Sequence, residues 1–410
     1  MNQQLREDAG FMISHAIQAV LPDTAVKRAL NGRRFSGRVV MIAAGKAAWQ
    51  MAKTALDCAG EQIDRGIVIT KYDHVKGSLP RTVCYEAGHP IPDENSFAAA
   101  EAAMRAVEGL SPQDTVLFLL SGGGSALFEK PRMNGEELQD ITKQLMACGA
   151  DIVEINTIRK RLSRVKGGQF ARLCAPARVV SIILSDVLGD PLDMIASGPT
   201  VPDRSTCQQA LEIARRYKLR LSPEAMHCLE TETPKALPNA EASVIGSVKG
   251  LCQAAAEACR ALGYSPILLT DRLCCEAKEA GSFLGSILAA HAGNGGKTAW
   301  LAGGETVVHL TGNGLGGRNQ ELALAAAAGI SGLNNAAVIS VGSDGTDGPT
   351  DAAGGYVDGD SLAELAKKGL SYAQLMENHD AYHALQAIGG LIKTGPTGTN
   401  VNDISIALLG

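Results

Sequence analysis

Three consecutive glycines between two serines follow an apolar run and have the chemistry to bind an anion. The run at 115–120 lacks alternation, which is typical of a parallel strand covered on both faces. The residues that follow it are Ser121, Gly122, Gly123, Gly124 and Ser125. Without Cβ atoms, backbone N–H groups can approach a phosphate or carboxylate closely beyond the end of a strand. A tight turn that binds nothing explains the same residues equally well.

Two charged residues follow other predicted strands in the same way. Lys46 follows a strand at 38–44 and precedes a helix predicted from Ala47, and Asp186 follows a strand at 178–184. A cation opposes the dipole of a helix start, so Lys46 is better explained by an anion beside it than by a solvent-directed lysine. Asp186 has the chemistry to hold Mg²⁺ or to accept a hydroxyl proton. All three features are predicted at one edge of a sheet.

A basic helix at 156–166 ends in the sequence Lys166-Gly-Gly. Its cations are suited to an anionic ligand, although a solvated basic face is the usual explanation of such a run. Glycines that open backbone N–H groups at a new helix start favour a contact with the ligand, and Lys166 is the cation nearest to them.

The second half of the chain carries a G-x-G-x-x-G pattern at Gly312, Gly314 and Gly317, followed by Arg318. A strand is predicted at 306–310 and a helix at 319–328, which is the context of a dinucleotide site. No acidic residue stands about 20 positions further on, where a dinucleotide ribose would need one. Arg318 instead suits a bidentate clamp on a carboxylate or phosphate, with Gly316 and Gly317 beside it.

Further carboxylates in this half are candidates for a metal. Asp344 begins an Asp-rich loop at 343–351 after a predicted strand, and Glu305 follows a glycine pair. Both could bind Mg²⁺ or a hydroxyl group. Turn formation by Asp-Gly pairs is the alternative for the loop.

The length of the chain suggests two or three domains, and its alternating strand and helix patterns predict an α/β fold. The chain has 410 residues, a mild net charge of −5 and ten cysteines without a C-x-x-C pair. These numbers argue against a polybasic nucleic-acid surface, a zinc site and a disulfide scaffold. No apolar run reaches the ~20 residues of a membrane helix and no signal peptide is evident, so we expect a cytoplasmic protein. The proline-rich stretch 231–239 predicts domains at 1–235 and 240–410.

In combination, these motifs resemble the class II glycerate kinases, which join an N-terminal glycerate-kinase domain to a C-terminal MOFRL domain. Members are often labelled as hydroxypyruvate reductases. The matching segments occur in the family's order over nearly the whole chain, with one departure at Arg161, where the family pattern has histidine. They are Ala44-Gly-Lys46-Ala, Ser121-Gly-Gly-Gly-Ser-Ala126, Asn156-Thr-Ile-Arg-Lys160, Lys166-Gly-Gly168, Ser185-Asp-Val-Leu-Gly-Asp190, Gly303-Gly-Glu305, Gly316-Gly-Arg-Asn-Gln-Glu321 and Ser343-Asp-Gly-Thr-Asp-Gly348.

The resemblance implies ATP-dependent phosphorylation of D-glycerate at O2, assisted by Mg²⁺. It also implies a larger Rossmann-like three-layer domain with a mostly parallel sheet, a smaller C-terminal α/β domain, and an active site in the cleft between them. Lys46 and Arg318 match the family's catalytic residues. We add Asp186 as a third catalytic candidate, because a carboxylate there could bind Mg²⁺ or accept the proton of the substrate hydroxyl. The expected partners are glycerate and ATP, with no nucleic acid and no membrane, and a homodimer is left open.

Two other functions remain open on the sequence. An NAD(P)H-dependent hydroxypyruvate reductase would use the glycine loop at 312–317, although the missing ribose carboxylate counts against it. A non-catalytic anion sensor would bind ligand without turnover. The Asp-rich loop at 343–351 favours a metal-using enzyme over a sensor.

Overall fold

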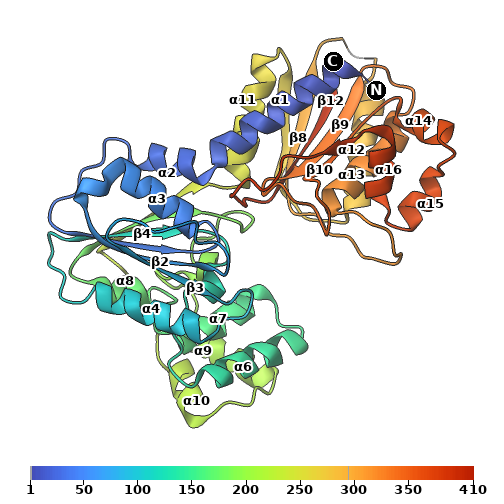
Figure 1. The fold of residues 1–410 in the computed structure, drawn as a ribbon. Helices are drawn as coiled ribbons and strands as arrows, with labels where there is room; N and C mark the ends of the chain where they lie inside the picture. The colour runs from blue at the N-terminus through green and yellow to red at the C-terminus, as the bar shows by residue number, and fades with distance from the viewer. Residues whose placement is uncertain (1, 294) are drawn as a thin grey trace. The chain divides into compact units, whose positions relative to one another are not determined.

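The computed structural model describes residues 2–293 and 295–410, which form two compact units (Figure 1). The first unit is Ala25–Ile245, and the second unit combines the segment up to Thr24 with Gly246–Gly410. This differs from the expected division at 231–239. The strand Ala240–Gly246 lies beyond the expected boundary, but it is the edge strand of the first sheet. The N-terminal helix belongs to the unit formed by the C-terminal part of the chain.

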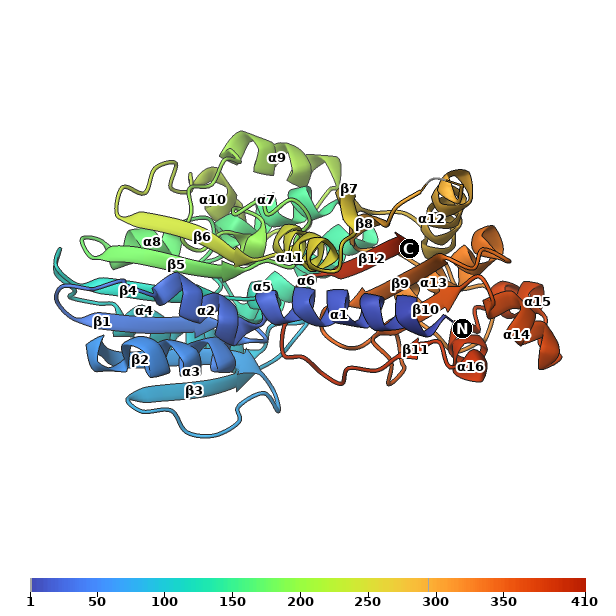
Figure 2. The same cartoon turned by 90° about the horizontal axis from the view of Figure 1, so that it is seen from above.

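The first unit is built on a six-stranded sheet in the order β3-β2-β1-β4-β5-β6, which Figure 2 shows edge to edge. The pairs from β3 to β5 are parallel, as predicted. The chain moves outward in one direction from β1 to β3 and then returns to β4 on the other side of β1. The strand order therefore reverses between β1 and β4, the place where such sheets bind ligands. The strands are β1 Val39–Ala44, β2 Ile63–Lys71, β3 Thr82–Ala87, β4 Thr115–Leu120, β5 Arg178–Leu184 and β6 Ala240–Gly246.

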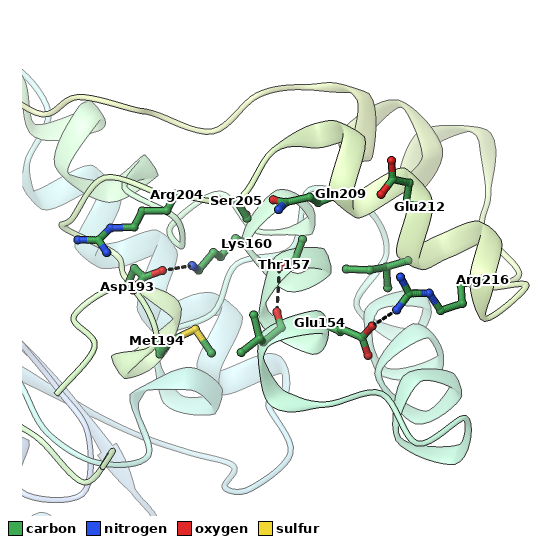
Figure 3. Close-up of a pocket in the computed structure, with 12 residues that line it drawn as sticks. Glu154, Thr157, Lys160, Asp193, Met194, Arg204, Ser205, Gln209, Glu212 and Arg216 are labelled. Atoms are coloured by element: carbon green, nitrogen blue, oxygen red, sulfur yellow. Dashed lines mark hydrogen bonds and ion pairs between the residues drawn. The ribbon is translucent and has the colours of Figure 1, made fainter. Parts of the chain in front are cut away.

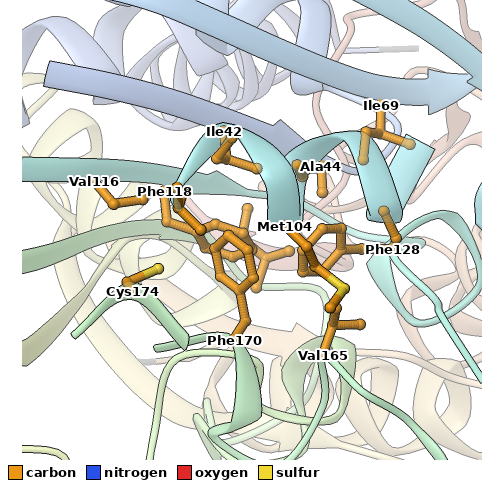
Figure 4. Packing of buried hydrophobic residues seen from close by; sticks show 14 of the residues in the cluster. Ile42, Ala44, Ile69, Met104, Val116, Phe118, Phe128, Val165, Phe170 and Cys174 are labelled. Atoms are coloured by element: carbon orange, nitrogen blue, oxygen red, sulfur yellow. The ribbon is translucent and has the colours of Figure 1, made fainter. Parts of the chain in front are cut away.

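Both faces of this sheet are buried, because apolar residues occupy both sets of alternating positions. Val40, Ile42 and Ala44 of β1 enter one core, and Val39, Met41 and Ala43 enter the other. In the first core Phe118, Phe128 and Phe170 pack together, with ring centroids 5.1–5.5 Å apart (Figure 4). The covering helices are α2 Pro22–Leu30, α3 Ala48–Ala59, α4 Glu94–Ala106, α5 Gly124–Leu127 and α8 Gln169–Cys174, with short turns at η1 Gly60–Gln62 and η2 Ile195–Ser197.

Four further helices of the first unit form a separate small bundle around their own apolar cluster. Leu138, Ile158 and Leu229 are among its buried residues. The helices are α6 Gly135–Ala147, α7 Ile152–Leu162, α9 Cys207–Arg216 and α10 Pro223–Glu230. Capping boxes at Asp151 and Thr206 fix the starts of α7 and α9.

The second unit has a mixed six-stranded sheet in the order β11-β10-β9-β12-β8-β7. Only β7 and β8 pair in parallel, and the last strand, β12, lies antiparallel between β8 and β9. The strands are β7 Ser265–Leu273, β8 Thr298–Gly304, β9 Ala336–Gly342, β10 Gly354–Asp358, β11 Leu391–Ile392 and β12 Asp403–Leu409.

Helices cover this second sheet on both faces. The N-terminal helix α1 packs against α11 and contacts β9 and β12. Helices α12 and α13 pack against each other; α12 contacts β9 and β12, and α13 contacts β9 and β10. The helices are α1 Gln3–Val20, α11 Val248–Ala261, α12 Ala277–His291, α13 Arg318–Ile330, α14 Ser361–Lys367, α15 Tyr372–Glu377 and α16 Ala381–Ile388. Among the described residues, no helix has the length and apolarity to span a membrane.

The strand predicted at 306–310 is absent, so that prediction was wrong. Residues 305–317 form a loop that belongs to no strand, and Val307 makes an isolated bridge with Glu276. Thr306 is buried and Val308 packs against the core, but Val307 is 45% and Leu310 73% exposed, so the segment is not covered as a strand inside a sheet would be. The strand–turn–helix context of a dinucleotide site is therefore missing.

Candidate active site

The loops after β1 and β4 interlock at the switch point of the first sheet. The N–H of Lys46 donates to the carbonyl of Gly122 (2.9 Å), and the N–H of Ala47 donates to Ser121 Oγ (3.0 Å). Gly45 has φ +122°, and a Cβ on it would lie 2.3 Å from Ser121 Oγ. A glycine is therefore required here, and the contact fixes Lys46 beside the glycine turn.

The glycine turn also packs directly against three side chains with ionisable groups. A Cβ on Gly122 would lie 2.3 Å from Asp186 Oδ2, so the carboxylate lies over the turn. A Cβ on Gly123 would lie 3.1 Å from His89 Nε2 and 3.3 Å from Lys46 Cγ. The structure thus brings Lys46, the turn and Asp186 together, as the sequence predicts. It adds His89, and burial together with the charge of Lys46 lowers the pKa of this imidazole.

The turn has donors to offer an anionic ligand. None of the hydrogen bonds described for residues 2–293 and 295–410 uses the N–H groups of Gly122, Gly123, Gly124 or Ser125. Gly123 adopts the left-handed region at φ +85°, which turns successive amides toward one side of the backbone. A cation, several amides and a carboxylate at one place are suited to binding and neutralising a phosphoryl group.

Lys166 stabilises this turn through hydrogen bonds to its backbone carbonyls. Its ammonium is fully buried and donates to the carbonyls of Ser125 (2.8 Å) and Phe128 (3.0 Å), with Glu129 Oε2 at 3.4 Å. Arg159 also donates to the Ser125 carbonyl, at 2.9 Å. Burial lowers the pKa of Lys166 to about 8, although the charge of Glu129 opposes the shift. This geometry favours a positioning role for Lys166 over a direct contact with a ligand.

A second support comes from an unusual left-handed turn after η2. Ala196, Ser197 and Gly198 have φ values of +50°, +59° and +63°. Such conformations cost about 1–2 kcal/mol for each residue with a side chain. The buried Ser197 hydroxyl donates to Asn156 Oδ1 (2.7 Å) and lies 3.4 Å from Ser125 Oγ. The strained turn thus positions Ser197 so that its hydroxyl connects Asn156 of α7 with Ser125 of the glycine turn.

The predicted residues of the second unit gather around Arg318, at the start of α13. The Arg318 guanidinium donates to Asp403 through Nε (2.5 Å) and Nη2 (3.0 Å), and its Nη1 lies 3.3 Å from Glu305 Oε1. Asp344 lies close to Asp403, because a Cβ on Gly342 would be 3.2 Å from Asp344 Oδ1 and 3.5 Å from Asp403 Oδ1. Burial raises the pKa of the Asp403 carboxyl to about 6, against the opposing hydrogen bond from Arg318.

The glycines near Arg318 serve packing. Cβ atoms on Gly312 and Gly314 would each lie 2.5–2.6 Å from the carbonyl oxygen of Asn378. A Cβ on Gly317 would lie 2.3 Å from the Asp347 carboxyl carbon, and Gly316 lies against Ala381. Asp347 accepts from the first N–H groups of α13, so its carboxylate caps that helix. The tight contact with Asp347 explains Gly317 without a cofactor, whereas a Cβ on Gly316 would meet only ordinary contacts at 3.4–3.5 Å.

The metal candidates are divided between the units. Asp186 belongs to the first unit, and Glu305 and Asp344 belong to the second. Within residues 2–293 and 295–410, no group of three or more His, Cys, Asp or Glu side chains is arranged to hold a metal ion.

Asp403 and Ser197 are the site residues that sequence reasoning missed. Asp403 closes a polar glycine-rich segment, and no local pattern marks it as the partner of Arg318, 85 residues away. Ser197 stands in Ser-Gly-Pro-Thr, a sequence typical of loops. Only the fold gives either residue a functional neighbour.

Comparisons with known proteins show the family of this chain. Residues 8–230 match the family described as a domain of unknown function, DUF4147, and residues 298–403 match the MOFRL family. The chain is 47% identical to the D-glycerate 2-kinase of Thermotoga maritima, with 99% of each chain covered. A crystal structure of the T. maritima glycerate kinase superposes with a TM-score of 0.97 and full coverage of both chains.

Of two further relatives, one is also named a glycerate 2-kinase and the other carries a different name. The glycerate 2-kinase of Pyrococcus horikoshii is 40% identical, with 99% of this chain and 97% of the relative covered. A protein of Agrobacterium vitis that carries a hydroxypyruvate reductase label is 41% identical, with 96% of this chain and 92% of the relative covered.

Proposed function

The chain belongs to the glycerate 2-kinase family that joins a DUF4147 domain to a MOFRL domain, and from that membership we propose its reaction. It transfers the γ-phosphoryl group of ATP to the 2-hydroxyl of D-glycerate, giving 2-phospho-D-glycerate and ADP. The observation that carries the proposal is the meeting of Lys46, the 121–125 turn and Asp186 at the switch point of the first sheet.

Phosphoryl transfer needs positioning and charge neutralisation more than covalent help from the protein. Lys46 neutralises charge on the transferring group, and the amides of residues 122–125 hold its oxygens. Asp186, directly over Gly122, accepts the proton of the substrate hydroxyl or binds Mg²⁺. The bond from γ-phosphorus to the bridging oxygen breaks as the bond to glycerate O2 forms.

Mg²⁺ fits this chain as a partner of the nucleotide. Kinase sites bind Mg²⁺ through one or two carboxylates together with substrate phosphates, so a cluster of three protein ligands is not needed. Asp186 is the first-unit carboxylate in the right place, and Glu305 and Asp344 are the second-unit candidates. The ion would neutralise phosphate charge.

Arg318 is the second cation that we propose for the reaction. Its Nε and Nη2 are held by the buried Asp403, whereas Nη1 meets Glu305, whose side chain is 48% exposed. An exposed ion pair is weak and exchanges readily. Nη1 can therefore exchange Glu305 for the glycerate carboxylate or a phosphoryl oxygen while Asp403 keeps the guanidinium in place.

The test is an assay of the purified chain with ATP, Mg²⁺ and D-glycerate, with products separated by phosphorus NMR. We expect 2-phosphoglycerate and ADP in equal amounts. Replacing a preorganised donor typically lowers kcat by about 10²–10³. Lys46→Ala and Arg318→Ala should therefore each lose at least that factor while the protein stays folded. Near-wild-type turnover by both variants would overturn the assignment.

The reductase remains as an alternative because of the A. vitis relative's label. It requires NAD(P)H oxidation that depends on hydroxypyruvate and not on ATP. The packing of Gly312 and Gly314 against Asn378 argues against it. A non-catalytic sensor would instead show a thermal shift with glycerate or phosphate and no turnover.

We also propose a cytoplasmic location, which cell fractionation tests. Light scattering of the purified chain distinguishes a monomer from a homodimer.

A further inference from the structure

A cavity of about 440 Å³ in the first unit lies between helices α7 and α9 (Figure 3). Val153 and Thr157 of α7 form one wall, and Gln209 and Ile213 of α9 form the opposite wall. In Figure 3 the Lys160–Asp193 ion pair stands near one end and the Glu154–Arg216 ion pair near the other. The cavity has the size of a small-molecule site.

The lining of this cavity suits a flat, polar heterocycle. Val153, Met194 and Ile213 offer apolar surface, while Thr157, Ser205 and Gln209 place hydroxyl and amide groups among them. A few polar groups on mostly apolar walls are typical of sites that orient an aromatic ring. The charged lining residues are three carboxylates and three cations, so the walls carry no strong net charge: Glu154, Asp193 and Glu212, and Lys160, Arg204 and Arg216.

One cation at the edge of the cavity differs from the others. Arg204 is exposed, and none of the hydrogen bonds or ion pairs described outside residues 1 and 294 involves its guanidinium. Lys160, by contrast, is buried between Asp193 and Asp203, and Arg216 is paired with Glu154. Arg204 also lines a second cavity of about 1000 Å³, which shares Asp193 with the first. It is thus available to a phosphate that leaves the first cavity.

The cavity is connected to the glycine turn through a short chain of side chains. Met194 lines it, and the Met194 sulfur accepts from Asn156 Nδ2 at 3.9 Å. Asn156 in turn accepts from Ser197, which meets Ser125 of the turn. Helix α7 therefore presents one face to the cavity and another to the residues that hold the turn.

We propose that this α7–α9 cavity binds the nucleoside end of the phosphoryl donor, with the phosphates passing Arg204 and Met194 toward the 121–125 turn. The inference rests on the proposed kinase function, because it names the place of that reaction's nucleotide. It also assigns a role to the small helical bundle.

Two neighbouring residues provide a matched test. Val153 lines the cavity and is 57% exposed, whereas Ile152 is 64% exposed and does not line it. Both are β-branched residues in the first turn of α7, so tryptophan at either position should be tolerated by the fold. Val153→Trp should raise the KM for ATP at least tenfold and leave the KM for glycerate within twofold. Ile152→Trp should match the wild type in both.

A binding measurement on the full chain separates the base from the phosphates. Calorimetry with ADP and with adenosine should show both ligands weakened at least tenfold by Val153→Trp. Arg204→Ala should weaken ADP about five- to tenfold and leave adenosine unchanged.

The outcomes distinguish the two levels of the proposal. If the wild-type chain does not phosphorylate glycerate, the proposed function is overturned. If the wild type turns over and Val153→Trp keeps its KM for ATP within twofold, or changes both KM values equally, the cavity assignment is overturned. Equal losses of ADP and adenosine on Arg204→Ala would overturn the direction assigned to the phosphates.

Discussion

At the scale of single residues, the pairing of Arg318 with Asp403 is the central contact of the second unit. Asp403 binds Nε and Nη2 of the guanidinium, so Nη1 can bind a substrate. A carboxylate that binds Nε and Nη2 fixes the plane of a guanidinium. Asp403 is the first residue of β12 and is buried, so the strand itself sets the position of Arg318. Asp403 is thus a positioning residue in the proposed reaction.

Asp403→Asn should lower kcat by about 10–100-fold, the usual loss when a group that orients a functional side chain is changed. The KM for ATP should change little, because the amide keeps the shape of the site. Steady-state kinetics with both substrates varied gives this separation. Since burial already disfavours the Asp403 charge, the urea midpoint should move only slightly.

Glu305→Gln is the matched control for this prediction. Its carboxylate meets the same guanidinium but is 48% exposed, so its removal should affect kcat less than Asp403→Asn does. Equal losses in the two variants would show that the anchored geometry of Arg318 is not what matters.

At the scale of elements, the glycine turn and the helix start after it depend on a buried ion pair. Lys166 holds two carbonyls of the 125–128 segment, and Glu129 is the carboxylate at its side. Loss of one partner leaves the other charge buried with a weaker counter-ion, here Arg159 at 3.7 Å. The turn is therefore held by tertiary contacts as much as by its own glycines.

Lys166→Met should destabilise the first unit by about 3–5 kcal/mol, since it leaves a buried charge without its main partner. Adding Glu129→Gln should restore part of that loss. Urea denaturation of the single and double variants at pH 7.5 measures both effects. A double variant that is less stable than Lys166→Met would contradict the assignment of the ion pair.

The difference in unfolding free energy between the wild type and Lys166→Met should depend on pH, because Lys166 titrates. Its pKa is about 8 in the folded state and near its ordinary value of 10.5 when unfolded, so between these values the unfolded chain binds the proton more tightly. The unfolding free energy of the wild type should then rise relative to Lys166→Met, by up to about 1.4 kcal/mol per pH unit above pH 8. If the difference in unfolding free energy between the wild type and Lys166→Met becomes smaller from pH 8 to 9.5, the lowered pKa of Lys166 is contradicted.

At the scale of the whole molecule, the second unit is built from two segments that are far apart in the sequence. Helix α1 precedes the first unit in sequence but buries its apolar face in the second, against α11. The buried residues of that face are Leu5, Ala9, Met12, Ile13, Ala16, Ile17 and Val20. A perturbation near the N-terminus should therefore be felt in the unit that carries Arg318.

Ile13→Ala should destabilise the second unit by about 2–5 kcal/mol, the usual cost of truncating a buried isoleucine. Amide hydrogen exchange should become faster in β9 and β12 and stay unchanged in β1 and β4. Ile42→Ala, an identical change in the core of the first unit, should give the opposite pattern. Faster exchange in β1 after Ile13→Ala would contradict the division of the cores.

Much of the first unit was determined by local sequence. Continuous apolar runs at 115–120 and 178–184 are strands because both faces are covered, and the charged or glycine residues after them fall at one edge of the sheet. A parallel sheet places the carboxyl ends of all its strands together. Lys46, the glycine turn and Asp186 were predictable from that rule and meet as expected.

The second unit was less predictable because its contacts are distant in sequence. The segment 306–310 is predicted as a strand, but β8 already pairs with β7 and β12, so no edge of β8 remains for it. Strand β6 lies beyond the proline-rich stretch, yet it completes the first sheet. Gly312 and Gly314 match a nucleotide pattern, but the backbone of residues 378–380 fills the space where a ligand would lie.

The sequence by itself therefore determined which residue types stand at the ends of the strands, and with them the class of chemistry. Tertiary structure alone decided that Lys166 faces inward, that Asp403 holds Arg318 and that a helix from one end of the chain completes the unit at the other. The physical reason is that strand ends follow from local pattern, whereas partners and burial depend on which distant segments pack together.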